Sequence, residues 1–231
     1  MSSIAERIKA VKQRVEQAAV QAGRQAEDVQ LIAVSKTKPT PDIEEAIASG
    51  QFHFGENKMQ ELAQKMDAIT HPSAQWHMIG TMQSNKIKYI APRVNWIHSV
   101  HKAKYLDEIE KRVPDGHHVH VLFQVNISGE SQKSGCSPDE LPRLLEHAAQ
   151  FSKLSVHGLM GISSMVDDPE QVRSEFSLLR ELFEHYREFD APNVSLTELS
   201  MGMSADLEVA IQEGATMVRV GSDIFGSRNY A

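Results

Sequence analysis

Residues 118–160 read HVHVLFQVNISGESQKSGCSPDELPRLLEHAAQFSKLSVHGLM and contain one complete strand–helix–strand unit. The apolar run at 118–126 is the clearest strand of the chain, because β-branched and aromatic residues dominate it. Pro138 opens a predicted helix, since proline is favoured in the first helical turn. The apolar side chains of this helix recur at helical spacing, at Leu141, Leu144, Leu145 and Ala148. A second apolar run at 153–160 completes the unit.

The same alternation of strand and helix runs along the whole chain. Eight apolar runs are predicted strands, at 30–36, 52–55, 75–80, 94–100, 118–126, 153–160, 196–202 and 216–222. Helical patterns lie between them, at 40–50, 57–68, 84–90, 102–112, from Pro138 onward, at 169–188 and at 204–213. Another helix is predicted over 3–22, with Gly23 as its stop. Thr40 and Pro41 are predicted as an N-cap and first-turn pair.

This alternation predicts the fold class. Strict alternation implies parallel strands that right-handed crossovers connect. Eight such units in 231 residues fit a closed (β/α)8 TIM barrel, which typically needs about 250 residues. An open, doubly wound sheet is the alternative, because periodicity does not reveal closure. We therefore predict an α/β protein with one TIM-barrel domain over residues 1–231 and an extra N-terminal helix.

The composition narrows the class of partner. The formal net charge is −7 and no cluster of Lys and Arg is legible, so we expect no binding to nucleic acid. The single cysteine, Cys136, excludes an internal disulfide and a cysteine-rich zinc site. No apolar run approaches the roughly 20 residues of a membrane span, and charges interrupt the N-terminal segment where a secretory signal is apolar. We expect a cytoplasmic protein, monomeric because no exposed apolar stripe is legible.

Two loops predict a phosphate site. In a TIM barrel the carboxyl ends of the strands build the site, and the loops after the seventh and eighth strands often hold a phosphate. Gly202 and Ser204 follow the seventh predicted strand, and Gly221 and Ser222 follow the eighth. Glycine lets the backbone approach an anion, while amide and hydroxyl groups donate hydrogen bonds to it. Because Gly and Ser are also ordinary turn residues, the prediction depends on both loops together.

Lys36 is the second signal, because it ends the first predicted strand and projects into the barrel mouth. Desolvation and neighbouring cations lower the pKa of a lysine, and its free amine can attack an aldehyde. Lys36 is therefore a candidate for a Schiff base, and the alternative is a solvated lysine that closes a strand. Lys38 lies beyond the strand, before Pro39, and is expected in solvent.

The remaining polar residues carry weaker signals. His117, His118 and His120 resemble a metal cluster, but one strand places at most two of them on one face, so we predict exposed histidines and no metal site. His77 is either a packed, hydrogen-bonded histidine or a base at a strand end. The acidic residues near the last helix are expected to form a solvated face, and they are Asp206, Glu208 and Glu213.

At Ala33-Val34-Ser35-Lys36-Thr37-Lys38-Pro39 the chain resembles the pyridoxal 5'-phosphate homeostasis proteins, also called the YggS/PROSC family. Three more blocks of the first half carry the resemblance: Phe54-Gly55-Glu56-Asn57, Trp76-His77-Met78-Ile79-Gly80 and Gln83-Ser84-Asn85-Lys86. The second half carries Lys133-Ser134-Gly135, His157-Gly158-Leu159-Met160, Leu199-Ser200-Met201-Gly202-Met203-Ser204, and Val218-Arg219-Val220-Gly221-Ser222 before Ile224-Phe225-Gly226. These blocks follow one another from about residue 30 to 228 and are together highly specific.

The resemblance implies a barrel similar to the cofactor domain of alanine racemase, with pyridoxal 5'-phosphate (PLP) held as a Schiff base on Lys36. Arg219 matches the arginine that faces the pyridine nitrogen, where a fixed cation disfavours protonation and weakens the ring as an electron sink. The residues matched to the cofactor phosphate are Ser200, Gly202, Met203, Ser204, Gly221 and Ser222. Those matched to other positions that line the cofactor are Asn57, His77 and Met78.

The resemblance implies a cofactor-handling protein without catalytic residues of its own. Racemases of this fold take a second base, a tyrosine, from a separate β domain, and we expect no such domain here; Tyr230 lies in the tail. We expect the protein to hold PLP reversibly for vitamin B6 homeostasis and to supply it to PLP-dependent apo-enzymes. Two alternatives are a PLP-dependent amino-acid racemase or lyase, and a Schiff-base aldolase or phosphosugar isomerase that uses no cofactor.

Overall fold

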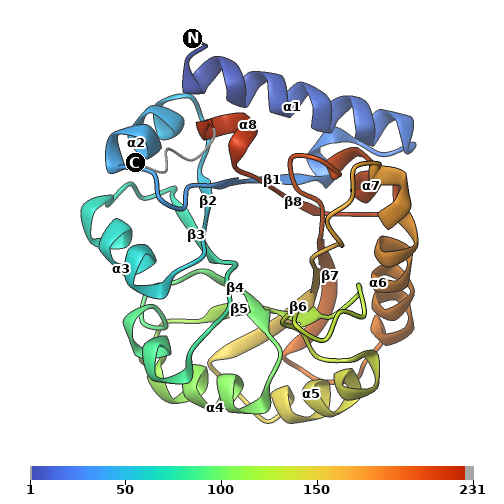
Figure 1. Cartoon of the computed structure of the whole chain (residues 1–231). Helices are drawn as coiled ribbons and strands as arrows, with labels where there is room; N and C mark the ends of the chain where they lie inside the picture. The colour runs from blue at the N-terminus through green and yellow to red at the C-terminus, as the bar shows by residue number, and fades with distance from the viewer. Residues whose placement is uncertain (1, 227–231) are drawn as a thin grey trace.

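The chain forms a closed barrel of eight parallel strands in the computed structural model, which describes residues 2–226 (Figure 1). Each strand pairs with its neighbour in sequence, and β8 closes the barrel against β1, with Arg219 opposite Ile32. The strands are β1 Gln30–Val34, β2 His53–Glu56, β3 Gln75–Met78, β4 Trp96–Val100, β5 Val119–Val125, β6 Leu154–Gly161, β7 Val194–Ser200 and β8 Met217–Val220. The predicted TIM barrel is confirmed, and the open sheet is wrong. Tyr230 lies outside the described residues.

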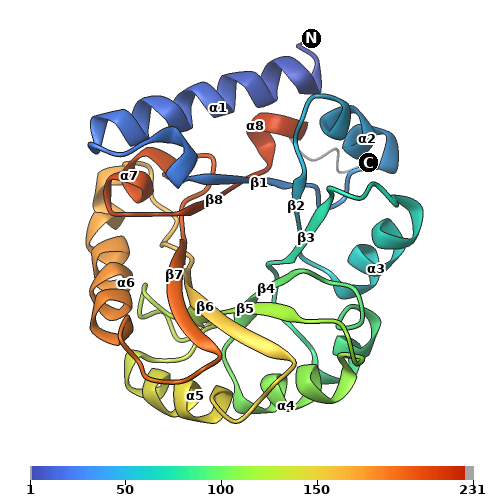
Figure 2. The ribbon, with the colours of Figure 1, turned by 180° about the vertical axis from the view of Figure 1, so that it is seen from behind.

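Helices surround the barrel, as both views along it show (Figures 1 and 2). The α-helices of the described residues are α1 Ile4–Gln21, α2 Thr40–Ala48, α3 Met59–Ala68, α4 Ala103–Arg112, α5 Leu141–Ala148, α6 Arg173–Tyr186, α7 Leu207–Gln212 and α8 Ser222–Phe225. Short 3-10 helices complete the outer layer, and they are η1 Ala26–Asp28, η2 Ser84–Tyr89, η3 Pro138–Glu140 and η4 Pro169–Val172.

The predicted leading helix is confirmed as α1. Its first turn is closed by a capping box, in which Ser3 Oγ accepts from the Glu6 amide and Glu6 Oε2 accepts from the Ser3 amide. The helix packs against α7 and α8 (Figure 2). Arg14 joins the three helices through ion pairs with Glu208 at 2.7 Å and Asp223 at 2.6 Å. The extra helix therefore braces the segments that follow β7 and β8.

Some predicted helices differ in detail from the observed ones. The segment predicted as a helix over 84–90 is the 3-10 helix η2. The helix predicted over 204–213 begins only at Leu207, because a turn precedes it in which Asp206 Oδ1 accepts from the Met203 amide at 2.6 Å. The predicted N-cap is also wrong: Thr40 lies within α2, Pro39 takes the cap position, and no side chain caps this helix.

The apolar core has two parts. Inside the barrel, four buried side chains pack together, namely Ile32, Leu122, Met160 and Met217. The larger part lies between the strands and the surrounding helices.

Among residues 2–226, no helix combines the length and the apolar character that crossing a membrane requires.

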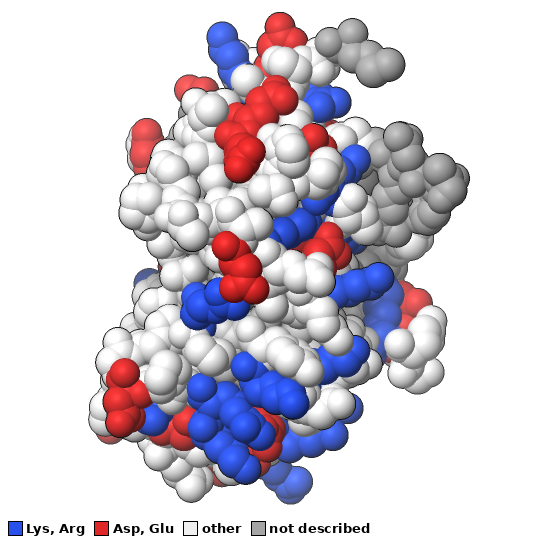
Figure 3. Space-filling view, turned by 90° about the vertical axis from the view of Figure 1, so that its left-hand side faces the viewer, with Lys and Arg blue, Asp and Glu red and all other residues white. Residues whose placement is uncertain are grey.

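One face of the molecule is more basic than we expected from the sequence. Figure 3 shows Lys and Arg side chains gathered in the lower part of this face. The stretch from 84 to 104 contains no Asp or Glu, and its basic residues are Lys86, Lys88, Arg93, Lys102 and Lys104. This concentration is local, because the whole chain keeps its net charge of −7.

Candidate functional site

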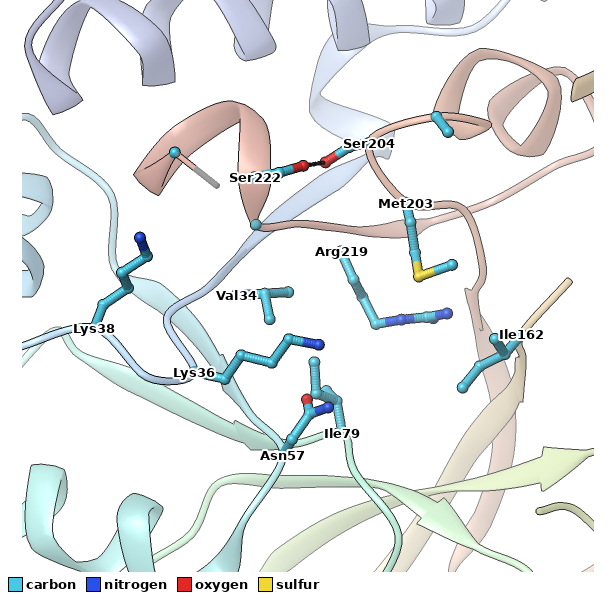
Figure 4. A pocket seen from close by; sticks show the side chains of 13 residues that line it. Val34, Lys36, Lys38, Asn57, Ile79, Ile162, Met203, Ser204, Arg219 and Ser222 are labelled. Carbon is cyan, nitrogen blue, oxygen red and sulfur yellow. Dashed lines mark hydrogen bonds between the residues drawn. The ribbon is translucent and has the colours of Figure 1, made fainter. Parts of the chain in front are cut away.

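A pocket of about 400 Å³ opens at the carboxyl ends of the barrel strands (Figure 4). Several of the predicted cofactor residues line it together: Lys36, Asn57, Met203, Ser204, Arg219, Gly221 and Ser222. The other lining residues are Val34, Lys38, Ile79, Ile162, Ala205 and Gly226. They come from segments far apart in the sequence, which the closed barrel brings to one end.

Lys36 follows β1 and its side chain extends into the middle of the pocket, toward Asn57 and Arg219 (Figure 4). The residues on either side of it are held by acidic side chains. Ser35 Oγ donates to Glu56 Oε1 at 2.6 Å, and the Thr37 amide donates to Glu61 Oε1 at 2.6 Å. Thr37 adopts a left-handed conformation with φ of 65°, which is uncommon for a residue other than glycine. These contacts determine where the Lys36 side chain starts.

A buried ion pair lies beneath this segment, and we did not predict it from the sequence. Lys65 Nζ lies 2.7 Å from Glu56 Oε1 and 2.8 Å from Glu61 Oε1, and it also donates to the Ser35 carbonyl oxygen at 2.7 Å. Burial raises the pKa of Glu56, while the neighbouring Lys65 opposes that change. A lysine on one helix face gives no sequence signal that it reaches a strand end.

Arg219 lies on β8 with its guanidinium directed into the pocket (Figure 4), and only 4% of the residue is exposed. Its Nη1 donates to Ser200 Oγ at 2.6 Å and its Nη2 donates to the Gly161 carbonyl oxygen at 2.8 Å. Burial lowers the pKa of Arg219 to about 10, and the negative charge of Asp206 opposes this change. Arg219 therefore presents a fixed positive charge at the pocket wall.

The loops after β7 and β8 meet at the Ser204 and Ser222 hydroxyls, whose oxygens lie 3.1 Å apart (Figure 4). Gly221 lies close to the end of β1, because a Cβ there would lie 3.3 Å from both the Cβ and the carbonyl oxygen of Val34. Ser222 begins α8, where the first backbone N–H groups have no partner within the helix. Hydroxyl and amide donors thus converge on one side of the pocket, as the phosphate prediction requires.

Four predicted cofactor residues do not line the pocket. His77 is wholly buried inside the barrel, 3.0 Å from His53 and 2.9 Å from His98. Met78, the next residue of β3, packs in the layer between strands and helices. Ser200 and Gly202 lie behind the wall that they support: Ser200 accepts from the Arg219 guanidinium, and the Gly202 carbonyl accepts from the Arg219 amide at 3.0 Å.

Two predictions about charged residues are wrong. Lys38 is not in solvent: it is half-buried, lines the pocket and donates to the Phe225 carbonyl oxygen at 2.8 Å. The acidic residues do not form a solvated face, because Asp206 and Glu213 are buried. Asp206 accepts from the Met203 amide within the turn before α7 and from Ser163 Oγ, which follows β6, each at 2.6 Å.

Two of the three histidines near the start of β5 differ from the prediction of exposed side chains. His118 is exposed, but His117 and His120 are half-buried. His117 Nε2 lies 3.1 Å from the Val94 carbonyl oxygen, and His120 Nδ1 lies 2.9 Å from His157 Nε2. Burial and the neighbouring histidines lower the pKa of His120 to about 4. Within the described ranges, no group of three or more His, Cys, Asp or Glu is placed to hold a metal ion.

The sequence matches the family model of the alanine racemase N-terminal domain over residues 7–229. The pyridoxal phosphate homeostasis protein of Pseudomonas aeruginosa is 44% identical over 231 residues, which cover 100% of this chain and 98% of the relative. The Escherichia coli protein of the same name is 37% identical over 238 residues, which cover 100% and 99% of the two chains.

Two solved structures are similar to this chain over nearly its whole length. PipY from Synechococcus elongatus with PLP bound is 34% identical, with a TM-score of 0.84 over 97% of this chain and 100% of that one. Alanine racemase from Corynebacterium glutamicum is 15% identical, with a TM-score of 0.72 over 95% of this chain and 62% of that one. At that identity the racemase shares the barrel fold alone.

Proposed function

The chain belongs to the pyridoxal phosphate homeostasis protein family, and we propose that it binds PLP in the pocket at the carboxyl end of the barrel and holds it for intracellular supply. The observation that carries the proposal is the placement of Lys36 in a pocket that also presents a buried arginine and two converging hydroxyls. These groups suit the reactive aldehyde, the ring nitrogen and the phosphate of this cofactor in chemical kind.

Each side chain has a separate task in this proposal. PLP, when bound, supplies an aldehyde that a lysine amine attacks and a ring that accepts electron density. Lys36 is the attachment residue, and the Asn57 amide lies beside its side chain (Figure 4). Arg219 donates toward the ring nitrogen and disfavours its protonation, because two cations repel. Ser204 and Ser222 hold the phosphate with the neighbouring backbone amides.

The proposed role is that of a carrier and not of a racemase. Among the described residues that line the pocket, the titratable side chains are Lys36, Lys38 and Arg219. Proton abstraction and return on opposite faces of a substrate require two positioned acid–base groups. His77 does not supply the second one, because it is wholly buried inside the barrel. Lys38 is the other lysine of the pocket, and its ammonium is held by the Phe225 carbonyl oxygen at 2.8 Å. Reversible binding, followed by release to PLP-dependent apo-enzymes, needs only the attachment residue and the phosphate donors.

An absorbance titration with PLP tests the attachment. The wild-type protein should develop a visible band that borohydride removes, and Lys36→Ala should lack it. Lys88→Ala, which removes an exposed lysine, is the matched control and should keep the band. A wild-type protein without the band would overturn the proposal and favour an aldolase or isomerase that uses no cofactor. A full band in Lys36→Ala would move the attachment to another lysine, and Lys38→Ala would be measured next.

A second experiment separates carrier from enzyme. The PLP-loaded protein is incubated with L- and D-amino acids, and racemisation and elimination products are measured. We expect no turnover, together with recovery of activity when the loaded protein is mixed with an apo-enzyme. Turnover that depends on Lys36 would favour the racemase or lyase alternative.

A further inference from the structure

A continuous chain of hydrogen bonds runs from the pocket wall through the inside of the barrel. Arg219 Nη1 donates to Ser200 Oγ at 2.6 Å, and that oxygen lies 2.9 Å from His98 Nδ1. His98 Nε2 lies 2.9 Å from His77 Nδ1, and His77 Nε2 lies 3.0 Å from His53 Nδ1. Five residues from β8, β7, β4, β3 and β2 are thereby joined end to end.

Arg219 sets the direction of this chain, because a guanidinium group only donates. Ser200 Oγ accepts from Arg219, and its own hydrogen is directed to His98 Nδ1. A neutral histidine accepts at one ring nitrogen and donates from the other. His98 therefore carries its hydrogen on Nε2 and donates to His77, which in the same way donates to His53.

The opposite direction leaves a buried polar group unsatisfied. If His98 Nδ1 donated to Ser200 Oγ, the Ser200 hydrogen would have no acceptor among residues 2–226, although Ser200 is wholly buried. Buried hydroxyl groups are almost always paired, since leaving one unpaired costs its full desolvation. The direction away from Arg219 satisfies every atom of the chain up to His53 Nδ1.

The surroundings of the histidines keep them neutral. His77 stacks on Trp96 with an interplanar angle of 9°, and apolar side chains fill the barrel beside them. Burial, with the neighbouring His98, holds the pKa of His77 well below its usual range, and burial with the charge of Arg219 does the same for His98. Burial also lowers the pKa of His53. A protonated histidine donates from both ring nitrogens, so in one of its hydrogen bonds to a neighbouring member of the hydrogen-bond chain two donors would face each other.

We infer that Ser200, His98, His77 and His53 are positioning residues for Arg219, and that all three histidines are neutral and carry hydrogen on Nε2. The hydrogen-bond chain holds Ser200 Oγ as an acceptor for Arg219 Nη1, beside the Gly161 carbonyl oxygen that accepts from Nη2. It ends at His53, the first residue of β2, which lines a cavity at the amino end of the barrel. Arg219 is therefore supported from the opposite end of the barrel.

The test is a long-range ¹H–¹⁵N NMR measurement on protein labelled with ¹⁵N-histidine at pH 7. His53→Gln, His77→Gln and His98→Gln assign the three signals. We expect each of the three to show a protonated Nε2 and a bare Nδ1. Any of the three with its hydrogen on Nδ1, or with both nitrogens protonated, would overturn the assignment. The measurement needs no cofactor, so its outcome is independent of the proposed function.

The positioning role has its own readout in the Ser200 variants. Ser200→Ala removes the acceptor, and we expect His98 to lose its single tautomer and the Arg219 guanidinium hydrogens to exchange at least tenfold faster. Ser200→Thr keeps the hydroxyl and should restore both signatures. If Ser200→Ala left the His98 tautomer and the Arg219 exchange unchanged, Ser200 would fill space only and the inference would fail.

Discussion

Lys65 Nζ lies 2.7 Å from Glu56 Oε1, and neither side chain is more than 8% exposed. The pair joins the last turn of α3 to the end of β2, and through the Ser35 carbonyl oxygen and hydroxyl it holds the residue before Lys36. The ammonium of one lysine therefore fixes the backbone that carries another. Buried ion pairs of this kind contribute little net stability but are costly to break from one side.

Lys65→Met should strongly destabilise the protein, because it leaves the Glu56 carboxylate buried without its cation. Breaking one side of a buried pair costs about 3–5 kcal/mol in the free energy of unfolding, which urea denaturation measures. The same variant should weaken the proposed attachment of PLP at Lys36, since Ser35 loses a donor to its carbonyl oxygen.

The control for this pair is a double-mutant cycle with Glu56→Gln. Glu56→Gln removes the charge and keeps a polar group, so Lys65→Met combined with Glu56→Gln should cost clearly less than the two single losses added together. Additive losses would show that the two side chains contribute independently and would contradict the coupling.

Gly80→Ala should disturb the pocket through Asn57. A Cβ on Gly80 would lie 2.3 Å from the Asn57 carbonyl oxygen, which is backbone and has no side-chain freedom to move away. Overpacking of this severity costs about 3 kcal/mol, so both the unfolding free energy and the affinity for PLP should fall. Gly23→Ala is the matched control, because that position has φ of +70° but nothing within 4 Å of the added carbon. It should cost about 1 kcal/mol and leave PLP affinity unchanged.

Cys136 should be inert toward thiol reagents in the folded protein. It is the only cysteine of the chain, it is 1% exposed, and burial raises its pKa to about 12. The thiolate is the reactive form, and a raised pKa leaves only a small fraction of the thiol ionised at neutral pH. This smaller thiolate fraction alone slows modification about a thousandfold relative to an ordinary cysteine. Reaction with a chromogenic disulfide is measured in buffer and in denaturing urea. Comparable rates in the two solvents would mean that Cys136 is accessible in the folded state.

The barrel was predictable because strand and helix alternate with little irregularity, and Lys36 was predictable because the apolar run before it places it at a strand end. Gly221 and Ser222 follow from the same reasoning, whereas the role of Arg219 came from the family resemblance. The predictions for His77 and Met78 show the limit of carrying residues over from a resemblance. Neighbours on a strand face opposite sides: His77 is buried inside the barrel, Met78 packs between strands and helices, and the next residue, Ile79, lines the pocket.

What the sequence could not reveal are contacts between distant segments. Lys38 was expected in solvent, but the preceding residue, Thr37, is left-handed and changes the direction of the backbone. The Lys38 ammonium donates to the carbonyl oxygen of Phe225 in α8, 187 residues away. Asp206 was expected on a solvated helix face, but the helix starts one residue later and the carboxylate closes the turn before it. Lys65 falls in the same group, since helical spacing does not show which strand end a long side chain reaches.

The buried histidines should make the protein less stable in mild acid. Burial keeps the pKa of His77 and His98 well below the usual value, so both stay unprotonated in the folded protein. In the unfolded chain the same histidines bind protons below about pH 6.5. The unfolded state then holds more protons, and the free energy of unfolding falls as the pH falls. Each such histidine contributes a slope of about 1.4 kcal/mol per pH unit below that value.

His77→Gln tests the size of this contribution. It removes one titrating group and keeps a polar side chain, so the slope of unfolding free energy between pH 6 and 5 should decrease by about 1.4 kcal/mol per unit. Met78→Leu changes the neighbouring position without a titrating group and should leave the slope as in the wild type. Urea denaturation at several pH values measures all three proteins. Equal slopes in the wild type and His77→Gln would mean that His77 binds a proton in the folded barrel, and the one-way hydrogen-bond chain to Arg219 would then lose its physical basis.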